Sequence, residues 1–93
     1  MIKSIPVQRV MMKMDCGTVS LINREMFKTN LSRFEAHLWN AIETADKDNL
    51  QLLRKAYPFH VAAWDHYKYT PGWWDNTRHK IITASEMNVV DPN

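Results

Sequence analysis

Hydrophobic residues recur at three- and four-residue steps between residues 24 and 46, and this spacing predicts one continuous helix. The positions are Phe27, Leu31, Phe34, Leu38, Ala41, Ile42 and Ala45. At about 100° per residue they form a stripe about 100° wide, which we expect to be buried. Asn23 is placed to cap the start, because its side-chain oxygen can accept from free backbone N–H groups. Trp39 projects about 100° from the stripe, among polar residues.

The first 22 residues resemble an extended segment. Several apolar residues crowd into residues 7–14, and Pro6 suits the start of a strand. Residues 15–18, Asp-Cys-Gly-Thr, are typical of a turn, because Gly17 can adopt a positive φ. Residues 18–22 then provide a return strand. The sequence therefore predicts a possible small β-hairpin, which must pack on the helices because an isolated hairpin is unstable in water.

Start and stop signals predict two more helices. Residues 48–51, Asp-Asn-Leu-Gln, match a capping box, and a helix follows as far as Tyr57. Pro58 ends this helix and suits the first position of the next, from Phe59 to about Tyr69. Thr70-Pro71-Gly72 ends that one. Residues 79–84 fit either a third short strand or a last helical turn.

These elements predict a mainly α fold, a compact helical domain with a possible small N-terminal β-hairpin; an α+β fold is the alternative. With 93 residues the chain is long enough for a single domain and too short for two cores. We expect an extended or hairpin segment over 1–22, a helical core over 23–70, and an aromatic loop and tail over 71–93. Glycine is scarce, which argues against a many-turned β-sandwich.

Charge and cysteine content narrow the classes of function. The net charge of +2 is spread along the chain, without the concentrated basic stripe of a duplex-DNA-binding protein. The single Cys16 cannot form an internal disulfide, so we expect a reducing, cytoplasmic location. No apolar run approaches about 20 residues, so no membrane contact is predicted.

No catalytic site, metal site or cofactor is predicted. Cys16 would need a neighbouring base to act as a nucleophile, and a small buried thiol is the commoner outcome. His60 and His66 do not share a helical face, and no zinc-type spacing is present. Glycine-rich phosphate-binding motifs are also absent. The sequence therefore predicts a binding protein and no enzyme; an enzyme assembled at an oligomer interface is a second alternative.

Aromatic and basic residues are concentrated in residues 57–80. Half of these aromatics are expected to fill the core. Trp, Tyr and Arg also anchor protein interfaces, and this predicts protein contacts at Trp39, Trp73, Trp74 and Arg78. The alternative is a nucleotide or single-stranded nucleic-acid binder, in which rings stack on bases and cations hold phosphates. Its residues would be His60, Trp64, Tyr67, Lys68, His79 and Lys80.

Residues 46–74, DKDNLQLLRKAYPFHVAAWDHYKYTPGWW, resemble small uncharacterised accessory proteins of tailed bacteriophages. The shared pattern is an acidic helix start, Leu-Arg-x-Ala-aromatic-Pro, Val-x-Ala, an aromatic, and Pro-Gly-Trp-Trp. The resemblance implies a viral accessory protein that binds and inhibits a host protein or defence complex, as anti-CRISPR proteins do, or sequesters a signalling nucleotide. It implies action in the cytoplasm of the host bacterium, and it carries over no catalytic residue.

A tryptophan on a polar helical face requires a cover. The N-terminal hairpin, the C-terminal segment or another chain could cover Trp39. The first two would make it part of the core. The third would make the protein a homo-oligomer or dependent on a partner.

Overall fold

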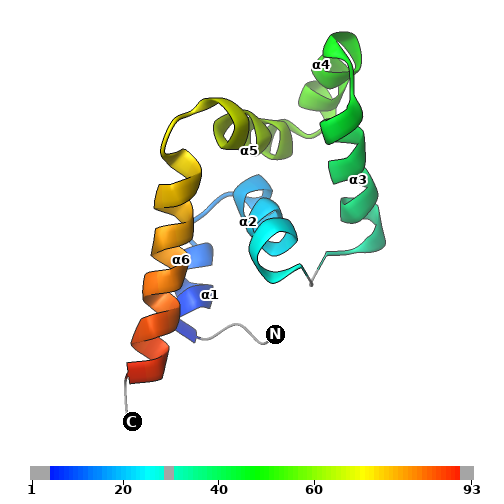
Figure 1. Cartoon of the computed structure of the whole chain (residues 1–93). Coiled ribbons are helices and arrows are strands. Elements are labelled where there is room, and N and C mark those ends of the chain that lie inside the picture. The colour runs from blue at the N-terminus through cyan, green and yellow to red at the C-terminus, as the bar shows by residue number, and fades with distance from the viewer. Residues whose placement is uncertain (1–4, 29–30, 91–93) are drawn as a thin grey trace.

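A computed structural model describes residues 5–28 and 31–90, and all regular structure in those residues is helical. The elements are α1 (Ile5–Met11), α2 (Cys16–Ile22), the π-helix η1 (Asn23–Phe27), α3 (Arg33–Thr44), α4 (Lys47–Ala56), α5 (Pro58–Tyr69) and α6 (Trp73–Val90). The mainly α prediction is therefore confirmed. In Figure 1, α2 lies in the middle, α5 passes above it, α3 lies on one side, and α1 and α6 lie on the other.

Most of residues 5–22 is helical, so the predicted β-hairpin is wrong; residues 1–4 of the predicted extended segment lie outside the described residues. α1 buries Val7 and Met11, which are one helical turn apart and lie on the same face. Asp15 begins α2 instead of a turn. Its carboxylate accepts hydrogen bonds from the backbone N–H of Thr18 over 2.8 Å and from the Thr18 hydroxyl over 3.1 Å. Such capping satisfies N–H groups that the first turn leaves free, so the crowded apolar residues fold as two short helices.

The segment from 24 to 46 is interrupted, so the predicted continuous helix is also wrong. α2 runs into η1, where the N–H of Lys28 donates to the carbonyl of Asn23 over 2.7 Å. Lys28 adopts a left-handed backbone with φ 56°, which ends the helix. Ser32 then caps α3, because its hydroxyl oxygen accepts from the Glu35 N–H over 3.0 Å. Asn23, the expected N-cap, is a buried residue inside helical backbone.

The buried face of α3 is rotated about the helix axis relative to the face that was predicted to be buried. Its buried residues are Leu38, Trp39 and Ile42, whereas Phe34 of the predicted stripe is 58% exposed. Trp39 was expected to project among polar residues and is instead fully buried. α2 and α5 cover its indole, so this chain itself provides the cover that the sequence left open.

α4 and α5 agree with the predicted helices, with one shift. α4 begins before the predicted capping box, because the Asp46 carboxylate accepts from the Asn49 N–H over 2.8 Å. Pro58 occupies the first turn of α5, as predicted, where no N–H partner is needed. α5 packs against α2, α4 and α6, which accounts for apolar residues on most of its sides.

α6 is a long helix, so the predicted aromatic loop and tail over 71–93 is wrong for residues 73–90. Residues 79–84, which fitted either a strand or a helical turn, are helical. The inner face of α6 follows a three- and four-residue spacing at Trp74, Thr77, Ile81 and Ala84. Because threonine and alanine are only weakly hydrophobic, the buried positions of α6 differ little from the exposed ones, and the pattern is hard to recognise in the sequence. None of the helices in the described residues is long and apolar enough to cross a membrane.

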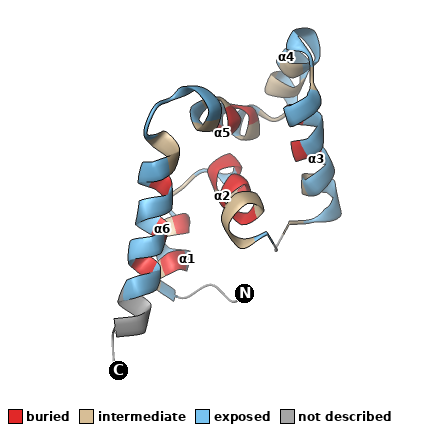
Figure 2. Ribbon diagram, in the orientation of Figure 1, coloured by how far each residue is buried: buried red, intermediate tan, exposed pale blue. Residues whose placement is uncertain are grey.

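Two hydrophobic clusters form the core, and α2 contributes to both. Leu21 belongs to the cluster with α3 and α5, whereas the next residue, Ile22, belongs to the cluster with α1 and α6. Gly17 allows α2 to approach α5 closely, because a Cβ at this position would lie 2.0 Å from the carbonyl oxygen of Phe59. Figure 2 shows buried residues along α2, between the helices on either side, so α2 is the central element of the fold.

Candidate functional site

The protein contacts predicted from the sequence lie mostly inside the fold. Trp39 is fully buried and offers no surface to a partner, so that prediction is wrong. Trp73 and Trp74 are half-buried and stack on each other, with ring centroids 6.3 Å apart. Arg78 is exposed, and its guanidinium lies 3.8 Å from the carboxylate of Asp75. Arg78 is therefore the most accessible residue of the predicted set.

The residues predicted to bind a nucleotide are divided between two regions. Three of them lie on the inner face of α5: His60, Trp64 and Tyr67. Lys68 lies over the Trp64 ring, with 5.4 Å between its Nζ and the ring centroid. His79 and Lys80 lie instead on α6, in recesses beside α1. The structure therefore does not bring the six residues into one aromatic and basic site.

A serine, a glutamate and a histidine meet beside Trp39, but their geometry is structural. The Ser20 hydroxyl donates to Glu35 Oε2 over 2.7 Å and accepts from the Trp39 indole N–H over 2.8 Å. His60 Nε2 lies 3.9 Å from the same Glu35 oxygen. A nucleophile must reach both a base and a substrate, whereas Ser20 is only 2% exposed and its hydroxyl bonds to two other side chains. The group holds α2, α3 and α5 together.

Other reactive side chains are scattered. Cys16, expected to be a buried thiol, is exposed at the first residue of α2. His66 Nδ1 lies 3.0 Å from the Thr70 hydroxyl at the end of α5. His79 Nε2 lies 3.4 Å from the Thr83 hydroxyl on α6. Within residues 5–28 and 31–90, no three His, Cys, Asp or Glu side chains are close enough to hold a metal ion.

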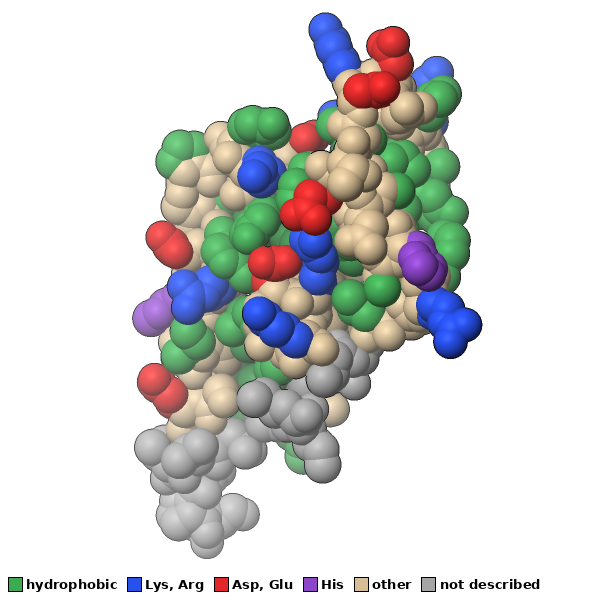
Figure 3. All heavy atoms as spheres, turned by 45° about the vertical axis from the view of Figure 1, so that its right-hand side comes forward, with side chains coloured by type: hydrophobic (Ala, Val, Ile, Leu, Met, Phe, Trp, Pro, Cys, Tyr) green, Lys and Arg blue, Asp and Glu red, His purple; other side chains and the backbone are tan. Residues whose placement is uncertain are grey.

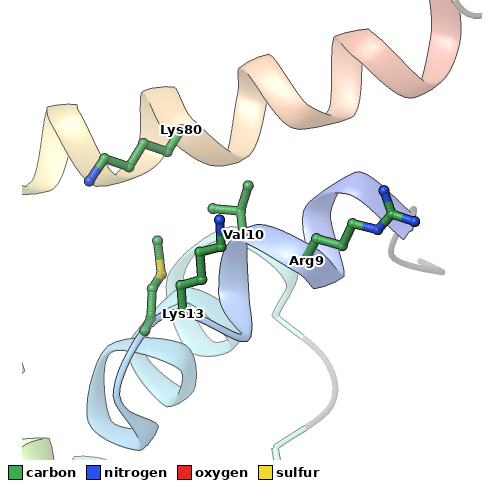
Figure 4. A pocket seen from close by; sticks show the side chains of 5 residues that line it. Arg9, Val10, Lys13 and Lys80 are labelled. Atoms are coloured by element: carbon green, nitrogen blue, oxygen red, sulfur yellow. The ribbon is translucent and has the colours of Figure 1, made fainter.

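Basic side chains surround a recess between α1 and α6, which we call the basic recess (Figure 4). It measures about 230 Å³ and is lined by Arg9, Val10, Lys13, Met14 and Lys80. In Figure 4, Val10 and the ammonium group of Lys13 point into the space between the helices, and Lys80 comes from the opposite side. Among the described residues, no acidic side chain forms an ion pair with any of the three cations. The basic recess therefore presents unneutralised positive charge beside an apolar floor.

A recess of about 460 Å³, lined by both apolar and polar residues, lies between α3 and α4, and we call it the α3–α4 groove. Its lining residues are Ala41, Thr44, Ala45, Asp46, Asn49, Leu52 and Leu53. Leu52 is 62% exposed, and α4 buries none of its residues (Figure 2). Phe34 lies on the same face of α3 as Ala41, two turns away. The ring centroids of Phe34 and Tyr57 are 5.8 Å apart. Figure 3 shows hydrophobic side chains gathered along this side of the molecule.

Sequence reasoning missed most residues of both surfaces. Arg9 lies on α1 and Lys13 lies in the turn that follows it, in a segment that was predicted to be extended. Phe34 and Ala41 were assigned to a buried stripe. No protein-family model, curated protein or solved structure matches the chain.

Proposed function

We propose that this protein acts by binding a partner protein, without catalysis, and that the α3–α4 groove is its main contact surface. The observation that carries the proposal is the apolar arc of α3. Leu38, Trp39 and Ile42 are buried inside this chain, while the adjoining face with Phe34 remains open to solvent. A helix that is apolar over so wide an arc is usually covered on both sides. A partner provides the second cover.

The occupant that fits the groove is an amphipathic helix of the partner. A helix between two others presents apolar side chains at three- and four-residue steps, and these fill the space above Ala45 and Leu52. Asp46 lies at the connection between α3 and α4 and lines the groove. The partner helix is therefore basic at the end that meets Asp46.

The resemblance of residues 46–74 to small tailed-phage proteins supports a viral accessory role, because it includes α4, one wall of the groove. The partner on this proposal is a host protein or defence complex in the bacterial cytoplasm, and occupancy of the groove blocks the partner's own contacts. A second copy of this chain is the competing occupant. Nucleotide binding has less support, because His79 and Lys80 lie away from the aromatic residues of α5.

Leu52→Glu tests the groove, and Ile82→Glu on α6 is the matched control, since Ile82 is also exposed and lies outside the lining residues. Each tagged variant is expressed in a bacterial host, crosslinked and captured from the lysate. We expect one partner to be captured by the parent and by Ile82→Glu and to be lost from Leu52→Glu. Its crosslinks should map to Lys47 or Lys55 on α4.

Two results would overturn the proposal. The first is a partner that Leu52→Glu captures as well as the parent does, with crosslinks away from α4. The second comes from light scattering of the purified proteins. A dimeric parent and a monomeric Leu52→Glu variant would show that a second copy fills the groove. Circular dichroism and thermal melts of all variants establish that the fold is retained.

A further inference from the structure

We infer that the basic recess is a second binding site, which takes an extended acidic segment of a protein. The inference does not rest on the α3–α4 groove. The molecule measures 51 × 29 × 18 Å, and Figure 1 shows α1 and α6 on the opposite side of α2 from α3. Each surface can therefore be altered without changing the other.

Among the described residues, the cations of the basic recess have no neutralising partner. Asp15 follows Met14 directly, but its carboxylate accepts two hydrogen bonds from Thr18 and caps α2. Asp75 on α6 lies nearest to Arg78 instead, at 3.8 Å. Like charges held around one recess raise the free energy of the folded protein unless an anion joins them. The charges are therefore available to a ligand.

The three cationic side chains of the basic recess are spread along the space between α1 and α6. In Figure 4, Lys80 lies towards one end of the space between the helices and Arg9 extends along α1 towards the other, with Lys13 between them. A compact anion such as phosphate would meet one or two of these groups. An extended chain with spaced carboxylates can meet all of them. The row therefore favours a segment with several acidic residues.

Part of the lining of the basic recess is apolar. Val10 and Met14 are half-buried in the recess, and a methionine thioether adapts its shape to different apolar groups. A neighbouring recess of about 330 Å³ shares Val10 and Lys80 and continues along α6 to Ala84. The two recesses, which share these residues, offer space for more than one side chain of a ligand. The ligand therefore carries apolar residues between its acidic ones.

The same lining argues against a nucleic acid as the ligand. Single-stranded nucleic acids are held by aromatic rings that stack on bases, together with a long basic track. No Phe, Tyr or Trp lines either recess, and His79 is the only aromatic ring among their lining residues. The exposed Phe and Tyr side chains of the described chain lie elsewhere: Phe34, Phe59 and Tyr69. An acidic peptide uses both the charges and the apolar lining.

Fluorescence anisotropy with a labelled peptide of alternating Glu and Leu residues tests this site directly. We expect the peptide to bind the parent protein and to lose about tenfold in affinity with Lys13→Glu/Lys80→Glu, because each exposed ion pair contributes modestly. Lys47→Glu/Lys55→Glu, which changes the net charge equally on α4, should bind like the parent. The same peptide with Gln in place of Glu should not bind.

Three outcomes would overturn the inference. They are no binding of the Glu/Leu peptide, an equal loss in both double variants, and tighter binding of labelled oligothymidine than of the peptide to the parent protein. A milder variant, Lys13→Gln/Lys80→Gln, keeps the test valid if charge reversal disturbs the fold. It should be at least as stable as the parent in a thermal melt while binding the peptide more weakly. The state of the α3–α4 groove affects none of these measurements.

Discussion

The indole N–H of Trp39 donates a hydrogen bond to the hydroxyl oxygen of Ser20 over 2.8 Å, inside the protein. The same hydroxyl donates to Glu35 Oε2 over 2.7 Å. A tryptophan is buried without penalty only when its single polar atom finds a partner. The hydrogen bond to Ser20 therefore explains how Trp39, which the helical pattern places among polar residues, can be part of the core. The same bond joins α2 to α3.

Ser20→Ala should lower the free energy of unfolding by about 1–3 kcal/mol, because the buried indole N–H loses its acceptor. Urea denaturation followed by circular dichroism measures the change. Ser85→Ala on the exposed side of α6 is the matched control and should have almost no effect. Equal stability of the two variants would show that the hydrogen bond between Trp39 and Ser20 contributes nothing to folding.

Gly17→Ala should be strongly destabilising, by about 3 kcal/mol or more, because overpacking here meets backbone that cannot rotate away. The added Cβ would lie 2.0 Å from the carbonyl oxygen of Phe59 and 2.6 Å from the nitrogen of His60. Gly72→Ala provides a contrast. Its φ of 81° is strained for alanine, but no atom lies within 4 Å of the new Cβ, so we expect a loss of about 1 kcal/mol. Chemical denaturation that ranks Gly72→Ala as the more harmful change would contradict the close packing of α2 on α5.

The sequence predicts those helix boundaries that local signals define. It does not predict which helical face is buried, because contacts between distant parts of the chain determine this. Pro58 marks the junction of α4 and α5 in both the prediction and the structure, because its ring acts on its own backbone. Ser32 and Glu35 match the sequence pattern of a capping box, and the Ser32 hydroxyl caps α3, but the long apolar stripe hid this signal in the sequence. The rotation of α3 was not predictable, since an apolar arc does not reveal which part of it the rest of the chain covers.

The candidate surfaces were harder to predict than the helices. Arg9 and Lys80 line the same recess only because α1 packs against α6, and no local pattern predicts that contact. Phe34 and Leu52 look like core residues in any helical pattern. Their exposure depends on how α3 and α4 sit on α5. A sequence therefore reveals that apolar residues share a face, while the fold decides whether that face is available to a partner.

Tyr67 gives the fold a pH dependence in the alkaline range. Burial raises the pKa of Tyr67 above its ordinary value of 10.0, and its hydrogen bond to Glu25, 3.0 Å long, raises it further. The unfolded chain ionises this phenol first, so its contribution to stability is complete below pH 10.0 and is lost as the pH rises through the folded pKa. The melting temperature should therefore fall above that pH, and less steeply in Tyr67→Phe.

Tyr69→Phe is the control for this titration, because Tyr69 is 75% exposed. Its melting temperature should follow the parent's curve at every pH. Ultraviolet difference spectroscopy should show a late-ionising phenol in the parent and in Tyr69→Phe, and no such phenol in Tyr67→Phe. Superimposable curves for all three proteins would refute a protected phenol at Tyr67.

The last prediction separates the two apolar faces of α3. Leu38→Ala should lower the free energy of unfolding by about 2–5 kcal/mol, because it leaves a cavity in the cluster with Trp39. Phe34→Ala removes a larger side chain but should cost less than about 1 kcal/mol, since Phe34 is 58% exposed and touches mainly the ring of Tyr57. Chemical denaturation measures both values.

Truncating a side chain that contributes to folding lowers the stability of the protein. Truncating a side chain that contacts only a partner lowers the binding of that partner. Phe34→Ala should therefore melt like the parent yet capture less of the partner that Leu52→Glu fails to capture. If Phe34→Ala proves as destabilising as Leu38→Ala, the outer face of α3 belongs to the core, and the α3–α4 groove is not the partner's site.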